Sequence, residues 1–308
     1  MYNKFMQKKL LISALLIFLV QLSYIKVVDK TSSQQLDNAL VRSLSVFAVA
    51  RGLNGLISVV QGTEVYATPA GVGVNFAVGQ IVDPMNDMLE RFSWVMLLSS
   101  VSLGIQKLLL EFSQTGLSQA LLACSALVLL FILWIPKLWH KQGFNLVFKS
   151  FVIFTFLRFF IPFVVLINEG IYTYMLEEQY LQAESSLSYS KEEISGEIKR
   201  VQALEKESKS VQKTYSGSFW EQGKEYFDTF GDSFNIQMYY QKFQKKLDKV
   251  LTSLQHKFNN AINDMLSLIA IFIMQSVLLP LLFLWAFIKL FQNFFRYDFA
   301  SFLDPEKS

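Results

Sequence analysis

The chain has 308 residues, of which 52% are hydrophobic, 15% aromatic and only 17% charged. Soluble domains carry about 25% charged residues, so this composition excludes a disordered chain and disfavours an ordinary soluble enzyme. One cysteine and two histidines exclude an internal disulfide and most thiolate or imidazole metal sites. A net charge of +3 gives no reason to expect a nucleic-acid partner.

Four segments are long and apolar enough to cross a bilayer, which takes about 20 residues of helix. They are Leu10–Val28, Leu117–Trp139, Asn145–Ile167 and Ser267–Ile288. The first ends in bulky residues rather than a cleavage site, so we interpret it as a retained anchor. Lysines and arginines gather at the N-terminus, between the second and third spans, and in the C-terminal tail. The sequence therefore predicts an all-α multi-pass membrane protein with both termini cytoplasmic.

This topology divides the chain into five parts. They are an N-terminal anchor span (1–28), an extracytoplasmic segment (29–116), the second and third spans (117–168), a second extracytoplasmic segment (169–266), and the fourth span with a cytoplasmic interfacial tail (267–308). Much of the chain is thus predicted to lie outside the cytoplasm, and it contains no N-x-Ser/Thr sequon. That absence favours a bacterial inner membrane over a eukaryotic cell surface.

Two further apolar stretches, residues 40–60 and 92–112, leave the number of spans open. Each carries polar or charged side chains, and a charge at the bilayer centre costs about 2.5–3.5 kcal/mol. We therefore favour amphipathic helices packed on the membrane or on the other spans, with two additional spans as the alternative. The polar residues are Arg42, Arg51, Asn54, Gln106, Lys107 and Glu111.

The first extracytoplasmic segment is predicted to contain two helices. Thr31–Gln34 matches a capping box, which predicts a helix from there to about Gln61. The pair Asp83-Pro84 is typical of a second helix start. Small and polar residues, including Ser100 and Gly104, then form a stripe along this helix. Such a stripe allows close packing against a neighbouring helix of the same chain or against a second subunit.

Between these helices, residues 63–81 alternate around Pro69-Ala-Gly71, a pattern typical of a β-hairpin. One face of the second strand is made of small residues, among them Gly71, Gly73 and Gly79. Glycine inside a strand indicates close approach by another backbone. This approaching backbone could belong to the flanking helices or to a strand of a second copy of the chain. Together with the small-residue stripe, these glycines are our candidate self-assembly residues.

The second extracytoplasmic segment shows apolar residues at alternating spacings of three and four. This pattern runs over 176–215 and again over about 238–265, and predicts an antiparallel coiled-coil hairpin continuous with the third and fourth spans. The cluster Ser185–Ser190 predicts a break in the first arm. Polar residues interrupt its heptads at Ser190, Glu197 and Ser208.

The tip of this hairpin, residues 216–235, is rich in aromatic residues spaced by glycines. Its candidate docking residues are Phe219, Trp220, Phe227 and Phe230. An aromatic patch of this size should not stay exposed on a monomer. The tip therefore either folds back over its own rings or docks onto an extracytoplasmic protein or a lipid surface.

Arg158 is the unusual residue of the predicted spans. It lies about 15 Å from the outer end of the third span, and a charge at that depth indicates a function by default. Pro162 follows it, as Pro280 follows Gln275 and Ser276 at a similar depth in the fourth span. With no acid inside the predicted spans, we expect Arg158, Gln275 and Ser276 to form a mid-membrane polar site. The site either fixes helix register or binds an anion or lipid headgroup.

The sequence carries no nucleophile elbow, phosphate-binding loop or zinc motif, so we predict no enzymatic activity and no metal or cofactor. The leading hypothesis is a membrane-embedded scaffold or partner-binding subunit that presents the coiled-coil arm outside the cytoplasm and self-assembles. The expected partners are the lipid bilayer, further copies of the chain and an extracytoplasmic protein. The alternative is an oligomeric channel or transporter whose polar point is Arg158.

Overall fold

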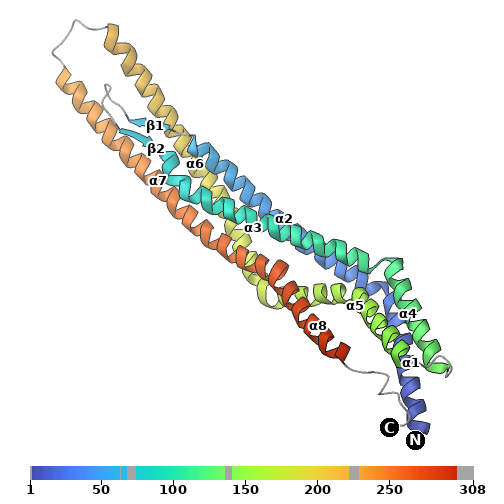
Figure 1. Ribbon diagram of the computed structural model, residues 1–308. Coiled ribbons are helices and arrows are strands. Elements are labelled where there is room, and N and C mark those ends of the chain that lie inside the picture. Colours follow the sequence, from blue (N-terminus) through green and yellow to red (C-terminus); the bar gives the residue numbers. More distant parts are fainter. Residues whose placement is uncertain (1, 63, 68–73, 136–140, 222–228, 297–308) are drawn as a thin grey trace. The chain divides into compact units, whose positions relative to one another are not determined.

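The computed structural model describes residues 2–62, 64–67, 74–135, 141–221 and 229–296 (Figure 1). Their elements are α1 (Tyr2–Tyr24), α2 (Lys26–Gln61), β1 (Glu64–Ala67), β2 (Val74–Ala77), α3 (Val78–Ser113), α4 (Gly116–Trp134), α5 (Lys141–Ile171), the π-helical turn η3 (Tyr172–Leu176), α6 (Glu177–Glu221), α7 (Thr229–Ile273), the π-helical turn η4 (Met274–Leu278) and α8 (Leu279–Arg296). The prediction of a helical protein is confirmed.

Six helices among the described residues are long and apolar enough to span a membrane. They lie within Met6–Tyr24, Lys26–Gln61, Val82–Ser113, Gly116–Trp134, Gly143–Ser210 and Gln241–Asn293. This set overlaps each of the four predicted spans and also includes the two stretches whose crossing the sequence left open. A multi-pass membrane protein is compatible with it, and the number of crossings stays a prediction.

The chain forms two compact units. Unit 1 comprises Met1–Ser43, Leu98–Glu177 and Phe272–Ser308, and unit 2 comprises Leu44–Leu97 and Glu178–Ile271. Because helices α2 and α3 each continue from one unit into the other, a single long helix contributes side chains to two separate cores.

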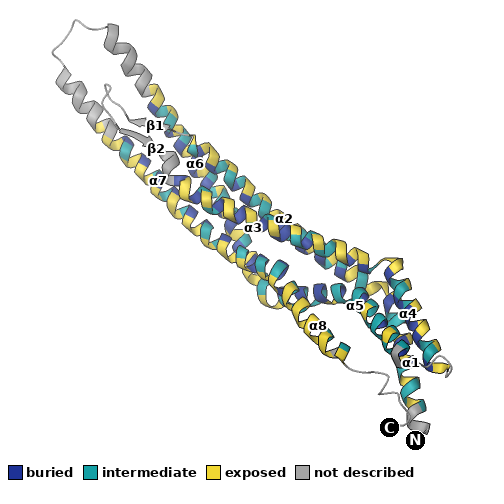
Figure 2. Ribbon diagram, viewed as in Figure 1, coloured by how far each residue is buried: buried dark blue, intermediate teal, exposed yellow. Residues whose placement is uncertain are grey.

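Unit 1 contains two hydrophobic clusters, and α5 contributes to both. The first joins α1, α4 and the beginning of α5 through Leu16, Leu122, Leu129, Phe144 and Phe151. The second joins α2, α3 and the later part of α5 through Leu36, Ala39, Leu103, Leu110 and Val165. Their buried residues recur at helical spacings, as the dark stripes along these helices in Figure 2 show.

Helices α2 and α3 run antiparallel within unit 1. Side chains pair Ser33 with Gln114, Asp37 with Lys107 and Ser43 with Ser100, so partner numbers fall along α3 as they rise along α2. The Ser43 and Ser100 hydroxyl oxygens lie 2.7 Å apart and are buried. Small side chains at this crossing let the two helices approach closely.

Unit 2 is built mainly from α6 and α7. The buried residues of α6 recur at spacings of three and four, and they include the polar positions Ser190, Glu197 and Ser208 at which the apolar pattern is interrupted. On α7 the buried series includes Phe243, Leu247, Leu254, Phe258 and Met265. Contacts between the two helices also run in opposite directions, from Ser186 with Asp264 to Glu207 with Lys246.

Three predicted helix boundaries were wrong. Helix α2 begins at Lys26, so the residues of the expected capping box lie inside it, and Thr31 donates to the carbonyl of Val27. Helix α3 begins at Val78, which places Pro84 inside it, while Asp83 accepts a bond from Gln61. Helix α6 continues through Ser185–Ser190 without a break. In each case a serine, threonine or aspartate has the bonding options of a cap but uses a different partner.

Two short strands lie within the segment for which the sequence predicts a hairpin. Strands β1 and β2 pair antiparallel, with Val65 opposite Phe76 and Tyr66 opposite Asn75. The expected turn at Pro69–Gly71, and Gly73 with it, lie outside the described residues. Gly79 belongs to the first turn of α3 rather than to the second strand.

Candidate functional site

Arg158 is the most completely enclosed charge of unit 1, with a side chain only 1% exposed. Its two terminal nitrogens donate to the two carboxylate oxygens of Asp29 at 2.9 and 2.7 Å. One of them also donates to the backbone carbonyl of Ser23 at 2.7 Å, and Nε donates to the Ser23 hydroxyl at 3.2 Å. A paired carboxylate and well-placed acceptors are what a buried guanidinium requires.

The position of these partners follows from the local fold. Helix α1 ends at Tyr24 and α2 begins at Lys26, so Ser23 offers a carbonyl at a helix C-terminus and Asp29 lies in the first turn of the next helix. A cation is favourable at the C-terminal end of a helix and an anion at the N-terminal end. Arg158 therefore bridges the corner between α1 and α2 with charges of the favourable sign.

The neighbouring corner between α3 and α4 contacts the same residues. Gln114, just after α3, donates to the carbonyl of Asp29 at 3.2 Å. Gln119, in the first turns of α4, donates to the carbonyl of Ser23 at 3.3 Å. We define Ser23, Asp29, Gln114, Gln119 and Arg158 as the corner cluster. Arg158 and Gln119 bond the carbonyl of Ser23, which lies at the C-terminal end of α1 and has no helical donor, and Gln114 adds a side-chain bond to the carbonyl of Asp29 in α2.

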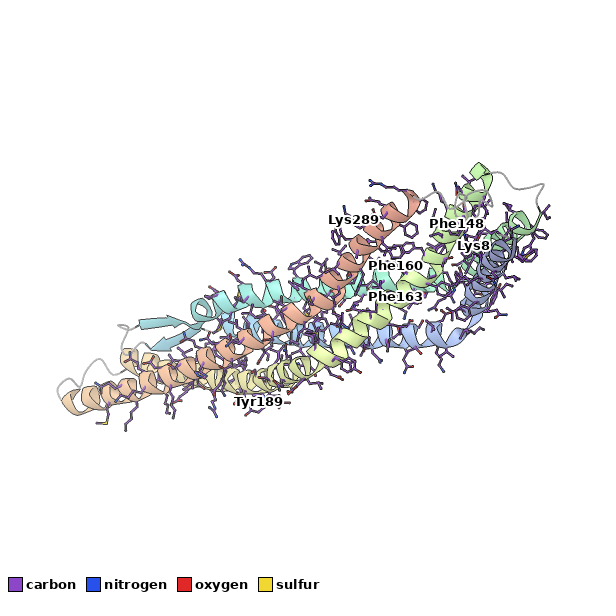
Figure 3. The ribbon with its side chains drawn as sticks, turned by 90° about the horizontal axis from the view of Figure 1, so that it is seen from below. Lys8, Phe148, Phe160, Phe163, Tyr189 and Lys289 are labelled. Carbon is purple, nitrogen blue, oxygen red and sulfur yellow. The ribbon has the colours of Figure 1, made fainter. Side chains whose placement is uncertain are left out.

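Gln275 and Ser276, which belong to η4, contact α5 at a different level from Arg158. Lys149 lies 5.7 Å from the ring of Phe295, and Phe156 stacks on Phe287 at 4.0 Å, so α5 and α8 run antiparallel. Figure 3 shows Phe160 on the side of α5 nearest α8, and its ring lies 5.1 Å from that of Phe287.

This register places Gln275 opposite Asn168, ten residues and about 15 Å from Arg158. The structure therefore does not bring Arg158 together with Gln275 and Ser276 as we expected from the sequence. Two separate polar clusters take the place of the single predicted one. The expectation that Arg158 lacks an acidic partner is likewise corrected, because Asp29 neutralises it.

The second cluster surrounds the π-helical turn η4. Here the amide of Leu279 donates to the carbonyl of Met274, one residue further back than in an α-helix, and Pro280 has no amide hydrogen. The carbonyls of Gln275 and Ser276 thereby lose their usual donors. Asn168 donates to the first at 2.7 Å, and Ser102 and Gln106 donate to the second at 2.7 and 3.0 Å. Side chains of α3 and α5 thus satisfy the backbone that this turn frees.

Further ion pairs join the helices of unit 1. Arg42 of α2 binds Glu169 of α5 through two hydrogen bonds of 3.3 and 2.9 Å, and its guanidinium lies 3.9 Å from the ring centre of Tyr172. Lys107 of α3 pairs with Asp37 of α2. Two of the charged residues that made residues 40–60 and 92–112 ambiguous as spans, Arg42 and Lys107, are therefore paired with acids of neighbouring helices, whereas Arg51 and Glu111 are exposed.

The candidate self-assembly residues occupy different environments. Ser100 is used by the contact with Ser43 inside the chain. Gly104 has open space where a side chain would project, so close packing does not require a glycine there. Gly71 and Gly73 lie outside the described residues, and Gly79 is helical.

The candidate docking tip is only partly described. Phe219 and Trp220 belong to α6 and Phe230 to α7, but their side chains, like the whole of Phe227, lie outside the described part of the chain. The docking hypothesis therefore stays a prediction.

Unit 2 contains a buried carboxylate that the sequence marked only as an interruption of the heptads. Glu197 of α6 accepts hydrogen bonds from Ser253 at 3.1 Å and from Lys257 at 3.0 Å, both on α7. Burial raises the pKa of Glu197, but the bonds from Lys257 and Ser253 and the nearby positive charges outweigh this and hold it below the ordinary value. Burial likewise lowers the pKa of Lys257, and its bonds to Glu197 and Glu193 raise it overall.

A groove of about 660 Å³ lies between α2 and α6 in the same unit. Gly52 forms part of its wall, and the Lys191 ammonium lies 2.8 Å from where a side-chain carbon on Gly52 would be placed. The groove mixes lysines with a glutamate and so shows no clear preference for one ligand charge. Its lining residues are Val49, Gly52, Leu56, Ser188, Lys191, Glu192, Ser195 and Lys199.

Taken together, these clusters join neighbouring helices through side-chain bonds. Among the described residues, no group of three histidine, cysteine, aspartate or glutamate side chains could hold a metal ion. The buried charges described above are bonded to one another and to backbone carbonyls. Sequence reasoning missed Asp29 as the partner of Arg158 because the two are 129 residues apart. Comparison of the chain with protein-family models, with curated proteins and with solved structures found no match.

Proposed function

We propose that this chain is a multi-pass membrane protein that acts as a scaffold or partner-binding subunit and not as an enzyme. The observation that carries the proposal is the pair of α6 and α7, each of 45 residues, joined by the contact of Ser186 with Asp264 and by the cluster around Glu197. Such a pair provides a long helical surface. The heptad spacing of its buried residues supports a coiled-coil arm.

The proposal places this arm outside the cytoplasm and both termini inside it, in a bacterial inner membrane. Lysines flank the predicted spans at the N-terminus, at Lys141 and Lys149, and at Lys289. An even number of crossings, four or six, keeps these segments on one side. The arm would then face the periplasm, where its aromatic tip is available to a protein partner.

The contacts of Arg158 support a scaffold more than a channel. An anion-conducting site needs a cation that an entering ion can reach, whereas Arg158 is bound to Asp29 and to Ser23. Its geometry fixes the α1–α2 corner. The same holds for Gln275 and Ser276, whose carbonyls accept bonds from neighbouring helices.

Affinity purification from membranes tests the proposal. The full chain, a variant lacking residues 216–235 and the substitution Arg51→Gln, an exposed residue of α2, are compared after chemical crosslinking. We expect specific extracytoplasmic partners with the full chain and with Arg51→Gln but not with the deletion. An unchanged set of crosslinked partners in a properly folded deletion variant would contradict the docking tip.

A further inference from the structure

The exposed face of α3 changes character at Trp94. Before this residue, the exposed side chains of the helix include Asp83, Asp87, Glu90 and Arg91. From Trp94 onward the exposed face is apolar until Glu111. The members of this stripe are Trp94, Leu98, Val101, Ile105, Leu108, Leu109 and Phe112.

The stripe has the length and the ends of a lipid-facing surface. Its residues recur at spacings of three and four and therefore share one side of the helix. From Trp94 to Phe112 the helix rises about 27 Å, close to the thickness of a hydrocarbon core of about 30 Å. Tryptophan is enriched where a membrane meets water, and the charged Glu90 and Arg91 lie just beyond it.

The remaining faces of α3 are already in contact with protein. Leu103 and Leu110 pack in the cluster with Leu36 and Val165. Ser102 and Gln106 bind the carbonyl of Ser276. The apolar stripe is thus the side of α3 that the described helices leave uncovered, and soluble proteins rarely expose a continuous apolar surface of this extent.

The pattern on the antiparallel neighbour α2 differs. At the level of Ile105 the exposed residue of α2 is Asn38. Gln34 and Ser45 are exposed on either side of it, and so are the apolar Val41 and Leu44. The continuous apolar stripe therefore belongs to α3, whereas the exposed face of α2 beside it mixes polar and apolar residues. On α4, the predicted span that follows, the exposed residues Leu127 and Phe131 are of the same kind as those of the stripe.

We infer that the stripe from Trp94 to Phe112 contacts the acyl chains of the bilayer, with Trp94 at the membrane–water boundary. A second copy of the chain fits less well, because a protein interface has a polar rim around its apolar centre, whereas the exposed residues of this stripe are all apolar from Trp94 to Leu109. The inference rests on the proposed membrane location. It makes α3 a membrane-embedded helix, where the sequence left residues 92–112 undecided.

Nitroxide accessibility in vesicles of phosphatidylethanolamine and phosphatidylglycerol tests this inference. With Cys124→Ser as background, single cysteines replace Ile105 on the stripe, Asp87 before the boundary and Leu127 on α4. Leu98→Cys repeats the stripe measurement in case one variant does not fold. Collisions with oxygen report lipid, and collisions with a water-soluble nickel chelate report solvent.

We expect labels at Ile105 and Leu98 to match the oxygen-rich, nickel-poor environment of Leu127. A label at Asp87 should be several-fold more accessible to nickel. Nickel access at Ile105 equal to that at Asp87 would overturn the inference, and so would spin–spin broadening between labels at Leu98, which indicates a second copy. The accessibility measurement uses the chain with its tip intact and does not depend on the deletion of residues 216–235. A failure of the docking-tip proposal can therefore be distinguished from a failure of this inference.

Discussion

At the scale of single residues, the strongest constraint in unit 1 comes from the guanidinium of Arg158. It is buried, so its charge has to be compensated inside the protein, and Asp29 and Ser23 provide that compensation from one helix corner. A buried ion pair adds little stability compared with an apolar replacement, but removal of one partner leaves an unpaired charge. The pair therefore specifies where α5 meets the corner more than it stabilises the fold.

This leads to a prediction for Arg158→Leu and Asp29→Leu. Each single substitution should destabilise unit 1 by about 3–5 kcal/mol, because it leaves the partner buried and unpaired. The double substitution should recover a large part of that loss. Thermal unfolding in detergent, followed by circular dichroism, measures the cycle. The exposed control Arg51→Leu should change stability by less than about 0.5 kcal/mol. A double variant as unstable as the sum of both singles would rule out the pairing.

Glu197 and Lys257 make the stability of the α6–α7 pair dependent on pH. The lowered pKa of Glu197 gives stability that is present above the ordinary value of 4.5 and lost as the pH falls through the folded-state pKa. The raised pKa of Lys257 gives stability that is present below 10.5 and lost as the pH rises through its folded-state pKa.

We therefore expect an unfolding temperature of unit 2 that changes little between these limits and falls in acid. Glu197→Gln should lower stability at neutral pH and flatten the acid-side fall. Circular dichroism melts of both proteins from about pH 3 to pH 8 provide the measurement. If the unfolding temperature of the variant falls in acid as steeply as that of the native chain, the pH dependence arises from other carboxylates.

At the scale of elements, the fold depends on how helices stay continuous through irregular turns. Turn η4 contains a π-type hydrogen bond, and Pro280, the second residue of α8, has no amide hydrogen to donate. Three side chains from α3 and α5 bind the backbone carbonyls that are left without helical donors. In an apolar environment an unsatisfied carbonyl costs several kcal/mol, so these side chains are required by the turn and not incidental to it.

Replacement of Pro280 by alanine tests this dependence. The new amide hydrogen can bond the carbonyl of Ser276, so the contribution of Ser102 to that carbonyl should shrink. We expect Ser102→Ala to lower the unfolding temperature of the native chain more than that of the Pro280→Ala variant. Melting of the four proteins gives the coupling, and equal losses in both backgrounds would show that Ser102 does not compensate for the proline.

The antiparallel register of α6 and α7 can be tested by disulfide formation. The Ser186 hydroxyl lies 2.7 Å from a carboxylate oxygen of Asp264, so cysteines at these positions should crosslink rapidly on mild oxidation. Ser186→Cys with Lys257→Cys, about two turns away on α7, provides the control and should crosslink poorly. Gel mobility before and after reduction gives the yield. Preferential crosslinking of the control pair would show a shifted register.

At the scale of the whole molecule, the described chain combines six helices able to span a membrane with two compact units. Helices α2 and α3 serve both units, so their two halves meet different requirements. The half in unit 1 pairs its charges with those of α3 and α5, and α3 there carries the apolar stripe. The half in unit 2 packs beside long, strongly polar helices.

An even number of crossings predicts that both termini lie on the same side of the membrane. Cysteines introduced at Asn3 and at Ser308, in the Cys124→Ser background, should both resist a membrane-impermeant maleimide in intact cells. A cysteine at Lys199, an exposed position of α6, should react. Opposite reactivity of the two termini would require an odd number of crossings and would overturn the topology.

Several features of the fold could be predicted because they depend on local pattern. The end of α2 at Gln61 and the buried heptad positions of α6 follow from residue spacing. The corner at Ile25 could not be predicted, since neither proline nor glycine marks it. The continuity of α6 through Ser185–Ser190 was missed for the opposite reason, because its serines resemble a cap yet lie along a helix that packs on α7.

Composition and periodicity predict a helical, apolar protein, because these patterns depend on neighbouring residues and need no knowledge of the fold. The sequence also marked Arg158 as a charge that requires compensation. The fold shows that Asp29 compensates this charge, and that Gln275 and Ser276 belong to another cluster, whose contact with α5 lies about 15 Å along that helix from Arg158. Helix bends and the register between helices are set by contacts between distant residues. Arg158 and Gln275 have a similar depth when residues are counted along their predicted spans, but this count did not identify which residues are in contact.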